Sequence, residues 1–180
     1  LELVLDAPPD GVVVAAVGDM VCSNINAVTP VDCHHQEVSD LLVADPDLDA
    51  FLALGDLQYP SRTLNDFQRH YEPSFGRVKA ITHPVVGNHK YQTPDASGYF
   101  DYFGPVAGDR AQGWYSFDVG DWHLVALNSN CSAIGGCGAG SAQEQWLRAD
   151  LAAHPSRCTL AYWHHPRFSS GSSHGSSTAT

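Results

Sequence analysis

Apolar runs alternate with amphipathic segments along the chain, and this alternation predicts a mixed α/β fold. Runs rich in β-branched and small apolar residues at 11–17, 49–54 and 80–86 are typical of strands. The first of them is continuous enough to suggest a strand buried on both faces. Apolar positions at helical spacing predict helices over 35–45 and over 63–75, the second ending near Pro73.

The middle of the chain predicts a long loop followed by a hairpin. Glycine, proline and aromatic residues are frequent between about 90 and 113, so this stretch is expected to be a loop. Its aromatic part, 97–104, has two interpretations: the wall of a substrate pocket, or packing against its own scaffold. Residues 113–129 then predict a hairpin with Gly120 and Asp121 at its turn.

The last third predicts one helix and one strand. Residues 141–154 have helical spacing, with Ser141 as the N-cap and Glu144 three residues later, the pattern of a capping box. Residues 158–163 form a final strand-like run. Strand, helix, strand, helix, strand and then a hairpin indicate an α/β protein with mixed strand pairing.

Polar clusters follow four of the strand-like runs. Functional residues of α/β sheets lie just beyond the carboxyl ends of the strands, so these clusters are the candidate site. A glycine precedes each of the first three, which lets the chain turn sharply there. Aspartate, asparagine, tyrosine and histidine suit hard or borderline cations, and a bridging carboxylate suits a pair of them. The clusters are Asp19; Asp56 with Tyr59; Asn88 with His89; and His164 with His165.

Length and charge narrow the classes of partner. The 180 residues suit a single domain over 1–180, with a Ser/Gly-rich segment at 169–180 that is either a flexible tail or an interrupted loop. Nine Lys and Arg against twenty Asp and Glu give a net charge of −11 without any basic stripe. This argues against nucleic acid or a membrane as the main partner. Metal ions would supply the positive charge that an anionic substrate needs.

Cysteine spacing bears on the compartment. Cys22 with Cys33, and Cys131 with Cys137, are each close enough to close a short disulfide loop, which would leave Cys158 unpaired. Two such loops favour an oxidising compartment and hence a secreted or extracellular protein. No signal peptide is visible at the start, so a secreted form implies its earlier removal. The alternative is five reduced thiols.

The motifs GDMV, GDLQY, GNHK and YWHHP, in this order, resemble the calcineurin-like metallophosphoesterase superfamily. That superfamily places a histidine two residues after its first aspartate, where this chain has Val21. Purple acid phosphatases also lack that histidine and use a tyrosine three residues after the second aspartate, where Tyr59 stands. The chain therefore resembles the purple acid phosphatase branch, which implies a layered α/β/β/α sandwich with mixed sheets.

This resemblance also implies a dinuclear metal centre. Asp19 and Tyr59 would bind the first metal, Asp56 would bridge, and Asn88 and His164 would bind the second. A phenolate favours a trivalent cation, so the implied pair is Fe(III) with Fe, Zn or Mn.

The resemblance further implies the reaction and its catalytic residues. The reaction is hydrolysis of a phosphate ester, as in an acid phosphatase-like phosphomonoesterase, by a metal-bound hydroxide. His89 matches a position that contacts the substrate phosphate and assists proton transfer. His165 would pack at the rim or contact substrate, and His174 is a further candidate for binding phosphate.

Two departures from the family pattern leave alternatives open. Lys90 stands where the family usually has glutamate, and the Gly-His-x-His block that supplies one histidine to each metal is not found. The expectation is that the C-terminal part of the fold is missing from this sequence, and that the two ligands lie beyond Thr180 or come from another chain. The alternatives are a catalytically silent fragment or degenerate binding module of the same fold, and a phosphodiesterase of the same superfamily.

Overall fold

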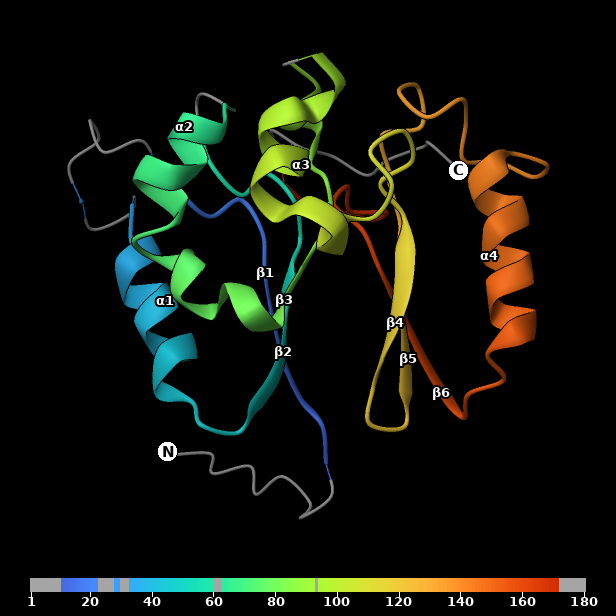
Figure 1. Cartoon of the computed structure of the whole chain (residues 1–180), viewed down its shortest axis with the longest axis horizontal. Coiled ribbons are helices and arrows are strands. Elements are labelled where there is room, and N and C mark those ends of the chain that lie inside the picture. The colour runs from blue at the N-terminus through green and yellow to red at the C-terminus, as the bar shows by residue number, and fades with distance from the viewer. Residues whose placement is uncertain (1–10, 23–27, 30–32, 60–62, 93, 172–180) are drawn as a thin grey trace.

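Two three-stranded sheets lie between layers of helices (Figure 1). The computed structural model describes residues 11–22, 28–29, 33–59, 63–92 and 94–171. The first sheet is parallel, in the order β1-β2-β3. Its strands are β1 (Val13–Val17), β2 (Leu48–Ala53) and β3 (Thr82–Pro84).

The second sheet mixes antiparallel and parallel pairing, in the order β4-β5-β6. The antiparallel hairpin predicted from the sequence is present, and Gly120 at its turn has a φ of 55°, a left-handed conformation suited to glycine. The last strand then pairs parallel to β5. The strands are β4 (Tyr115–Val119), β5 (Trp122–Ala126) and β6 (Cys158–Tyr162).

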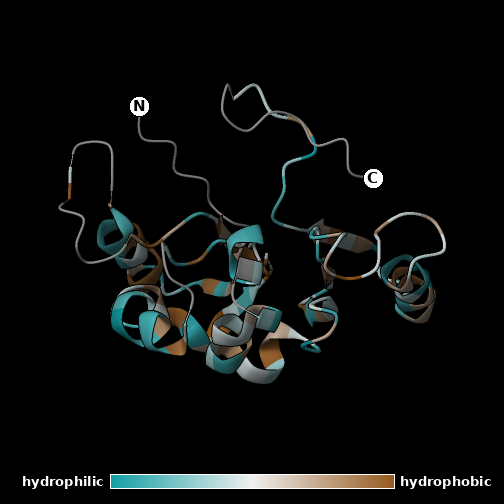
Figure 2. Ribbon diagram, turned by 90° about the horizontal axis from the view of Figure 1, so that it is seen from above, coloured by the Kyte–Doolittle hydropathy of each residue, from teal (hydrophilic) through white to brown (hydrophobic). Residues whose placement is uncertain are grey.

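Helices cover the outer face of each sheet. Helices α1, α2 and α3 lie on the side of the first sheet and α4 lies on the side of the second (Figure 1), and Figure 2 views the same ribbon from above. The order of layers is therefore α/β/β/α, as the resemblance implies. The helices are α1 (His35–Ala44), α2 (Leu64–Asp66), which continues as a π-helical segment (Phe67–Tyr71), α3 (Ser97–Phe103) and α4 (Ala142–Ala153). Short 3-10 segments cover 75–81, 88–92, 94–96 and 104–107. None of the helices in the described ranges has the length and apolar character needed to cross a bilayer.

Side-chain alternation along β2 divides the core in two. Phe51 and Ala53 join the larger apolar cluster between the first sheet and its helices, while Leu52 points the other way. Leu52 packs with residues of both sheets in a smaller cluster, which we call the interlayer cluster. Its buried members are Leu52, Val85, Leu124, Ala126 and Tyr162.

The first strand differs from its prediction. The side chains of β1 alternate between half-buried and exposed, and Val14 is 37% exposed. The expected burial on both faces is therefore wrong. The reason is that β1 is an edge strand of its sheet, so its outer side lacks a neighbouring strand among the described residues.

The predicted loop at 90–113 is also wrong in part. It contains α3, whose aromatic residues Tyr99, Phe100, Tyr102 and Phe103 are all buried in the larger cluster. This confirms scaffold packing as the role of the aromatic segment. The sequence did not predict this helix because α3 is buried on most sides. A helix without a polar face shows no alternation of polar and apolar residues at helical spacing.

Both cysteine pairs form disulfides, and Cys158 is reduced. Cys22 joins Cys33 at a Cα–Cα distance of 5.4 Å, and Cys131 joins Cys137 at 5.1 Å. The alternative of five reduced thiols is therefore not the arrangement in this structure. The first disulfide lies three residues after Asp19 and so anchors the segment that leaves β1.

Candidate metal centre

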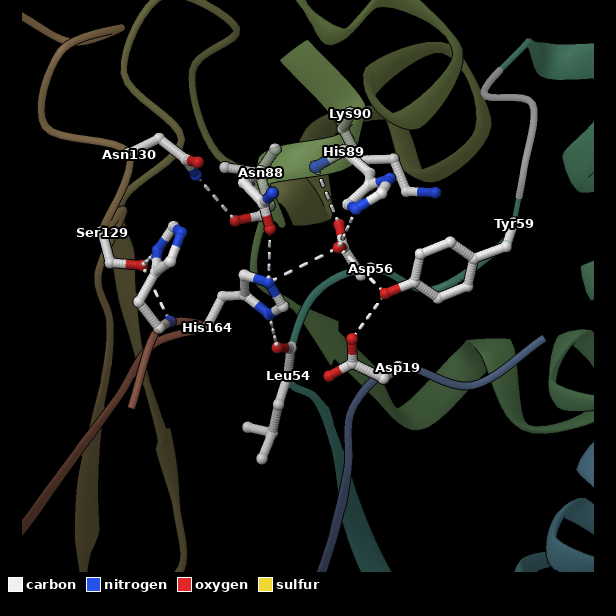
Figure 3. A network of polar contacts seen from close by, with 12 residues as sticks. Asp19, Leu54, Asp56, Tyr59, Asn88, His89, Lys90, Ser129, Asn130 and His164 are labelled. Atoms are coloured by element: carbon white, nitrogen blue, oxygen red, sulfur yellow. Dashed lines mark hydrogen bonds and ion pairs between the residues drawn. The ribbon is translucent and has the colours of Figure 1, made fainter. Parts of the chain in front are cut away.

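The carboxyl ends of the strands bring the predicted ligands to one place (Figure 3). Because β1, β2 and β3 are parallel, the residues that follow them lie at the same edge of the sheet. Asp19 follows β1, Asp56 follows β2 and Asn88 follows β3, while His164 reaches in from the end of β6. Residues far apart in the sequence thus meet across two sheets.

Tyr59 lies beside two carboxylates. Its hydroxyl is 2.5 Å from Asp19 Oδ1 and 3.0 Å from Asp56 Oδ2, although a phenol has only one proton to donate. Burial, followed by the hydrogen bond to Asp19 and the charge of Asp56, raises the pKa of Tyr59 well above its ordinary value. Without a cation the phenol keeps its proton, and a strongly charged cation is what would displace it.

Val21 explains how Tyr59 reaches this place. The pairing of β1 with β2 continues past the strand ends, so that the Tyr59 amide donates to the Val21 carbonyl at 2.8 Å. The Val21 side chain is fully buried in the larger cluster. Where the superfamily has a histidine ligand, this chain therefore has a core residue, and Tyr59 from the adjacent segment lies beside Asp19 instead.

One ring nitrogen of His164, Nε2, has a lone pair that can bind a cation. Its Nδ1 is 2.8 Å from the Leu54 carbonyl oxygen, which can only accept, so Nδ1 carries the proton. The other nitrogen, Nε2, then faces Asn88 Oδ1 at 2.9 Å and Asp56 Oδ2 at 3.6 Å. Three electron-rich atoms converge there, which is the arrangement that a bound metal ion stabilises.

Asp56 lies between these two groups of ligands. Its Oδ2 is the oxygen that faces both the Tyr59 hydroxyl and His164 Nε2, while Oδ1 accepts a hydrogen bond from the His89 amide at 3.0 Å. The residue is only 1% exposed. The ligand atoms of Asp19, Asp56 and His164 lie within 4.8 Å of one another. The donor set of Asp19, Asp56 and His164 therefore fits a bound metal ion.

Backbone strain and close contacts hold this geometry. Asp19 and Asp56 have φ angles of 53° and 47°, a conformation that non-glycine residues rarely adopt and that often marks functional sites. At Gly87 a β-carbon would lie 2.1 Å from Asp56 Oδ1, and at Gly55 one would lie 2.7 Å from the His164 ring. Side chains at these two glycines would collide with the ligands themselves.

His89 and Lys90 have different surroundings although they are neighbours. The His89 side chain is 37% exposed, packs edge-on against the Tyr59 ring and has Nε2 3.8 Å from Asp56 Oδ2. Lys90 is fully buried, and its Nζ donates to the Gln58 carbonyl oxygen at 2.5 Å above the Phe67 ring. His89 therefore faces the solvent side of the site, whereas Lys90 joins the segments after β2 and β3 from within.

His165 is held by a residue that the sequence analysis missed. Its Nδ1 lies 2.7 Å from Ser129 Oγ, which also accepts from the His165 amide. Burial, together with the neighbouring His164, lowers the pKa of His165. His165 and Ser129 line a cavity of about 230 Å³ beside α4. His174 falls outside the described residues.

Two further polar residues after β5 support the site. Asn130 donates to the Val86 carbonyl at 3.1 Å, and Asn128 Oδ1 accepts from the Asn130 amide. These contacts fix the second sheet against the segment that leads to Asn88. The rule that identified the other clusters would also have found them, because Asn128, Ser129 and Asn130 likewise follow the carboxyl end of a strand.

Comparison with known proteins yields one finding on the family. The sequence model of the family described as calcineurin-like phosphoesterase matches residues 12–180, which is nearly the whole chain. A search of curated proteins found no match.

Proposed function

The chain belongs to the calcineurin-like phosphoesterase family, and we propose that within this family it is an acid phosphatase-like phosphomonoesterase of the purple acid phosphatase branch. Metal-dependent hydrolysis of phosphate esters is the chemistry of the family. We infer the branch from two residues that differ together from the wider superfamily. Val21 stands in place of a histidine ligand, and Tyr59 is the candidate ligand instead. Val21 is buried in the core, and the Tyr59 hydroxyl lies 2.5 Å from the Asp19 carboxylate.

The position of Asp56 Oδ2 is the observation that carries this proposal. It lies 3.0 Å from the Tyr59 hydroxyl and 3.6 Å from His164 Nε2, so a single oxygen faces both ligand groups. A carboxylate in this position suits a dinuclear centre. Asp19 and Tyr59 would complete one site, and Asn88 and His164 the other.

The donor chemistry indicates which ions would bind. A phenolate with two carboxylates favours a trivalent ion, so we assign Fe(III) to the site of Asp19 and Tyr59. An amide oxygen and an imidazole nitrogen favour Fe, Zn or Mn in the site of Asn88 and His164. When bound, the two ions would supply Lewis acidity, polarising the phosphoryl group and acidifying the attacking water.

The surrounding residues would bind and orient the ester. The exposed His89 ring lies beside Asp56 and Tyr59. In this proposal it would donate a hydrogen bond to a phosphate oxygen and protonate the leaving alkoxide. His165, whose Nδ1 contacts Ser129, would contact the organic part of the substrate at the edge of the 230 Å³ cavity. His174 stays a proposal from the sequence alone.

Two disulfides are compatible with an extracellular location, which we also propose.

The alternative to an active enzyme is a silent module of the same fold. It is favoured by the lack of a Gly-His-x-His block within the printed sequence. A phosphodiesterase would differ in the shape of the pocket rather than in these ligands.

Replacing the central carboxylate tests the proposal. Asp56→Asn keeps the shape of the side chain but removes the charge, so we expect loss of bound metal and a fall in phosphatase activity by at least about 10³-fold. Metal content measured by mass spectrometry and hydrolysis of p-nitrophenyl phosphate are the two readouts. Asp101→Asn, which removes an exposed carboxylate paired with Arg110, is the matched control.

The outcomes separate the hypotheses. Stoichiometric iron with a visible phenolate-to-iron absorption in the unaltered chain supports the enzyme, and neither metal nor colour supports the silent module. Activity retained in Asp56→Asn would exclude the proposed centre. Faster hydrolysis of a diester such as bis-p-nitrophenyl phosphate would point to the phosphodiesterase instead.

A further inference from the structure

A second polar cluster lies at the opposite end of the second sheet. His123 is the second residue of β5, just after the hairpin turn, whereas Ser129 and Asn130 near the candidate centre follow the other end of that strand (Figure 1). Around His123 stand Asp118 of β4 and two residues from the end of α4, Asp150 and His154. None of these residues takes part in the proposed phosphatase site.

Both ring nitrogens of His123 face carboxylates. The side chain is 1% exposed, Nδ1 lies 2.7 Å from Asp118 Oδ1, and Nε2 lies 2.9 Å from Asp150 Oδ2. A carboxylate that accepts from one ring nitrogen orients the other nitrogen as a metal ligand, and this pairing recurs in metal sites. With its proton on Nδ1, His123 directs the Nε2 lone pair at an Asp150 oxygen. A second proton or a metal ion at Nε2 would remove the repulsion between these two electron-rich atoms.

His154 adds a third ligand group. It lies one helical turn after Asp150, and its ring stacks on that of His123 with 4.6 Å between the centroids. Donor atoms of His123, Asp150 and His154 all lie within 4.8 Å of one another. The His154 side chain is 47% exposed, and it borders a surface hollow together with Asp118. The hollow therefore opens on the exposed side of the cluster, at His154 and Asp118.

The local charge also favours a cation. The cluster stands at the carboxyl end of α4, where the exposed carbonyl groups carry partial negative charge. No basic residue occupies the last turn of this helix. Asp118 and Asp150 add two carboxylates, and Asp121 borders the same surface hollow.

We propose that His123, Asp150 and His154 form a binding site for a divalent transition metal, with Zn²⁺ as the best match. Two imidazoles, one carboxylate and a water are a common tetrahedral donor set for zinc. Asp118 is the positioning residue that orients His123. The bound ion fastens the β4–β5 hairpin to the end of α4. This site is independent of the proposed phosphatase centre.

Zinc titration of the whole chain tests the site in a background without the first centre. The Asp19→Asn/Asp56→Asn double variant removes both carboxylate ligands proposed for that centre. We expect it to bind one Zn²⁺ per chain at pH 7.5, measured against a competing chelator. Adding His154→Ala, a substitution at a half-exposed side chain, should weaken this binding by about 100-fold. His34→Ala, which removes an exposed histidine that lies 3.6 Å from Glu37, is the control and should leave it unchanged.

A second measurement separates a ligand from a general structural effect. Asp118→Asn should weaken Zn²⁺ binding by about 10-fold, because it alters only the orientation of His123. Cobalt in place of zinc should give the intense visible bands of a tetrahedral complex, and these bands should vanish in His154→Ala. Zinc binding that is absent from the double variant, or that His154→Ala does not change, would overturn the proposal. His123 would then be a buried imidazolium held by two carboxylates.

Discussion

At the scale of single residues, the centre depends on two kinds of small detail. Asp19 and Asp56 adopt left-handed conformations, and the glycines at 87 and 55 leave room for the Asp56 carboxylate and the His164 ring, respectively. The motif spacing predicted which side chains meet. It did not predict that the Leu54 carbonyl would fix the proton on His164, because a backbone group carries no signal in the residue pattern.

Gly87→Ala should disable the centre and also destabilise the segments around it. A β-carbon there would lie 2.1 Å from Asp56 Oδ1 and 2.2 Å from the Asp56 amide, so the Asp56 carboxylate and its backbone must move. A displacement of this kind costs about 10²-fold in activity, and we expect a parallel loss of metal. Metal content and p-nitrophenyl phosphate hydrolysis are the measurements. Gly104→Ala, where a β-carbon meets open space, should lose only about 1 kcal/mol of stability. Normal metal content in Gly87→Ala would contradict this account.

His83 should make the fold sensitive to mild acid. Burial lowers the pKa of His83 from 6.5 to about 4, and its ring stacks on Phe117. The unfolded chain therefore binds a proton below pH 6.5 while the folded chain does not, so stability falls as the pH drops from 6.5 towards 4. Because the side chain is partly exposed, the loss attributable to His83 should be about 1–2 kcal/mol.

The matched variant for this pH effect is His83→Phe, which keeps a ring against Phe117 but cannot titrate. Urea unfolding followed by tryptophan fluorescence at pH 7 and pH 4.5 gives the two free energies of unfolding. The unaltered chain should lose about 1–2 kcal/mol more than the variant between these values. An equal loss in both proteins would assign the acid sensitivity to other groups.

At the scale of elements, the strands and the strongly patterned helix α4 were predicted well, whereas the buried helix α3 was not. The start of α4 is confirmed, since the Ser141 side chain accepts from the Glu144 amide at 3.2 Å. The other half of the expected capping box differs, because the Glu144 carboxylate accepts from the Gly140 amide instead. Local side-chain chemistry thus identified an end of a helix, whereas α3 was missed because tertiary burial rather than periodicity stabilises it.

The disulfide after β1 should stabilise both the fold and the centre. Cys22 and Cys33 are 11 residues apart, and closing a loop of this length restricts the unfolded chain by about 2–3 kcal/mol. Cys22→Ser/Cys33→Ser should therefore lower the free energy of unfolding by that amount. Because Cys22 lies three residues after Asp19, metal affinity should fall as well. Chemical denaturation and metal titration are the measurements.

Cys158→Ser is the control for this prediction, because Cys158 is half-buried and forms no disulfide. Its free energy of unfolding and metal affinity should change little. If the double variant also retains the metal affinity of the unaltered chain, the disulfide does not hold Asp19 in place, whatever its effect on stability.

At the scale of the whole molecule, the candidate centre lies where the two sheets meet. Asp19, Asp56 and Asn88 follow strands of the first sheet, while His164 follows β6 of the second. The interlayer cluster joins the same two sheets through apolar contacts. The layered α/β/β/α order was predictable from the resemblance. The exposed side of β1 was not, because exposure depends on which strand stands at the edge.

Removal of metal should therefore loosen one sheet relative to the other. A chelator is expected to lower the melting temperature and to speed hydrogen–deuterium exchange in β6, whose end carries His164. Amides of β2, at the centre of the first sheet, should change little because both of its faces are packed. Exchange measured by mass spectrometry with and without chelator provides the comparison. Equal acceleration in β2 and β6 would show that metal stabilises the molecule as a single unit.

His164 follows β6 of the second sheet and contacts residues that follow strands of the first sheet, so its position depends on how the two layers are packed. Its imidazole contacts both the Leu54 carbonyl and Asn88, so any slippage of one layer along the other is transmitted directly to the spacing of the ligands. Leu124 belongs to the interlayer cluster and is not a candidate ligand. Replacing it with a smaller residue would let the layers shift and so change the distances between the candidate ligands. The packing of the interior therefore sets the distances between the candidate ligands.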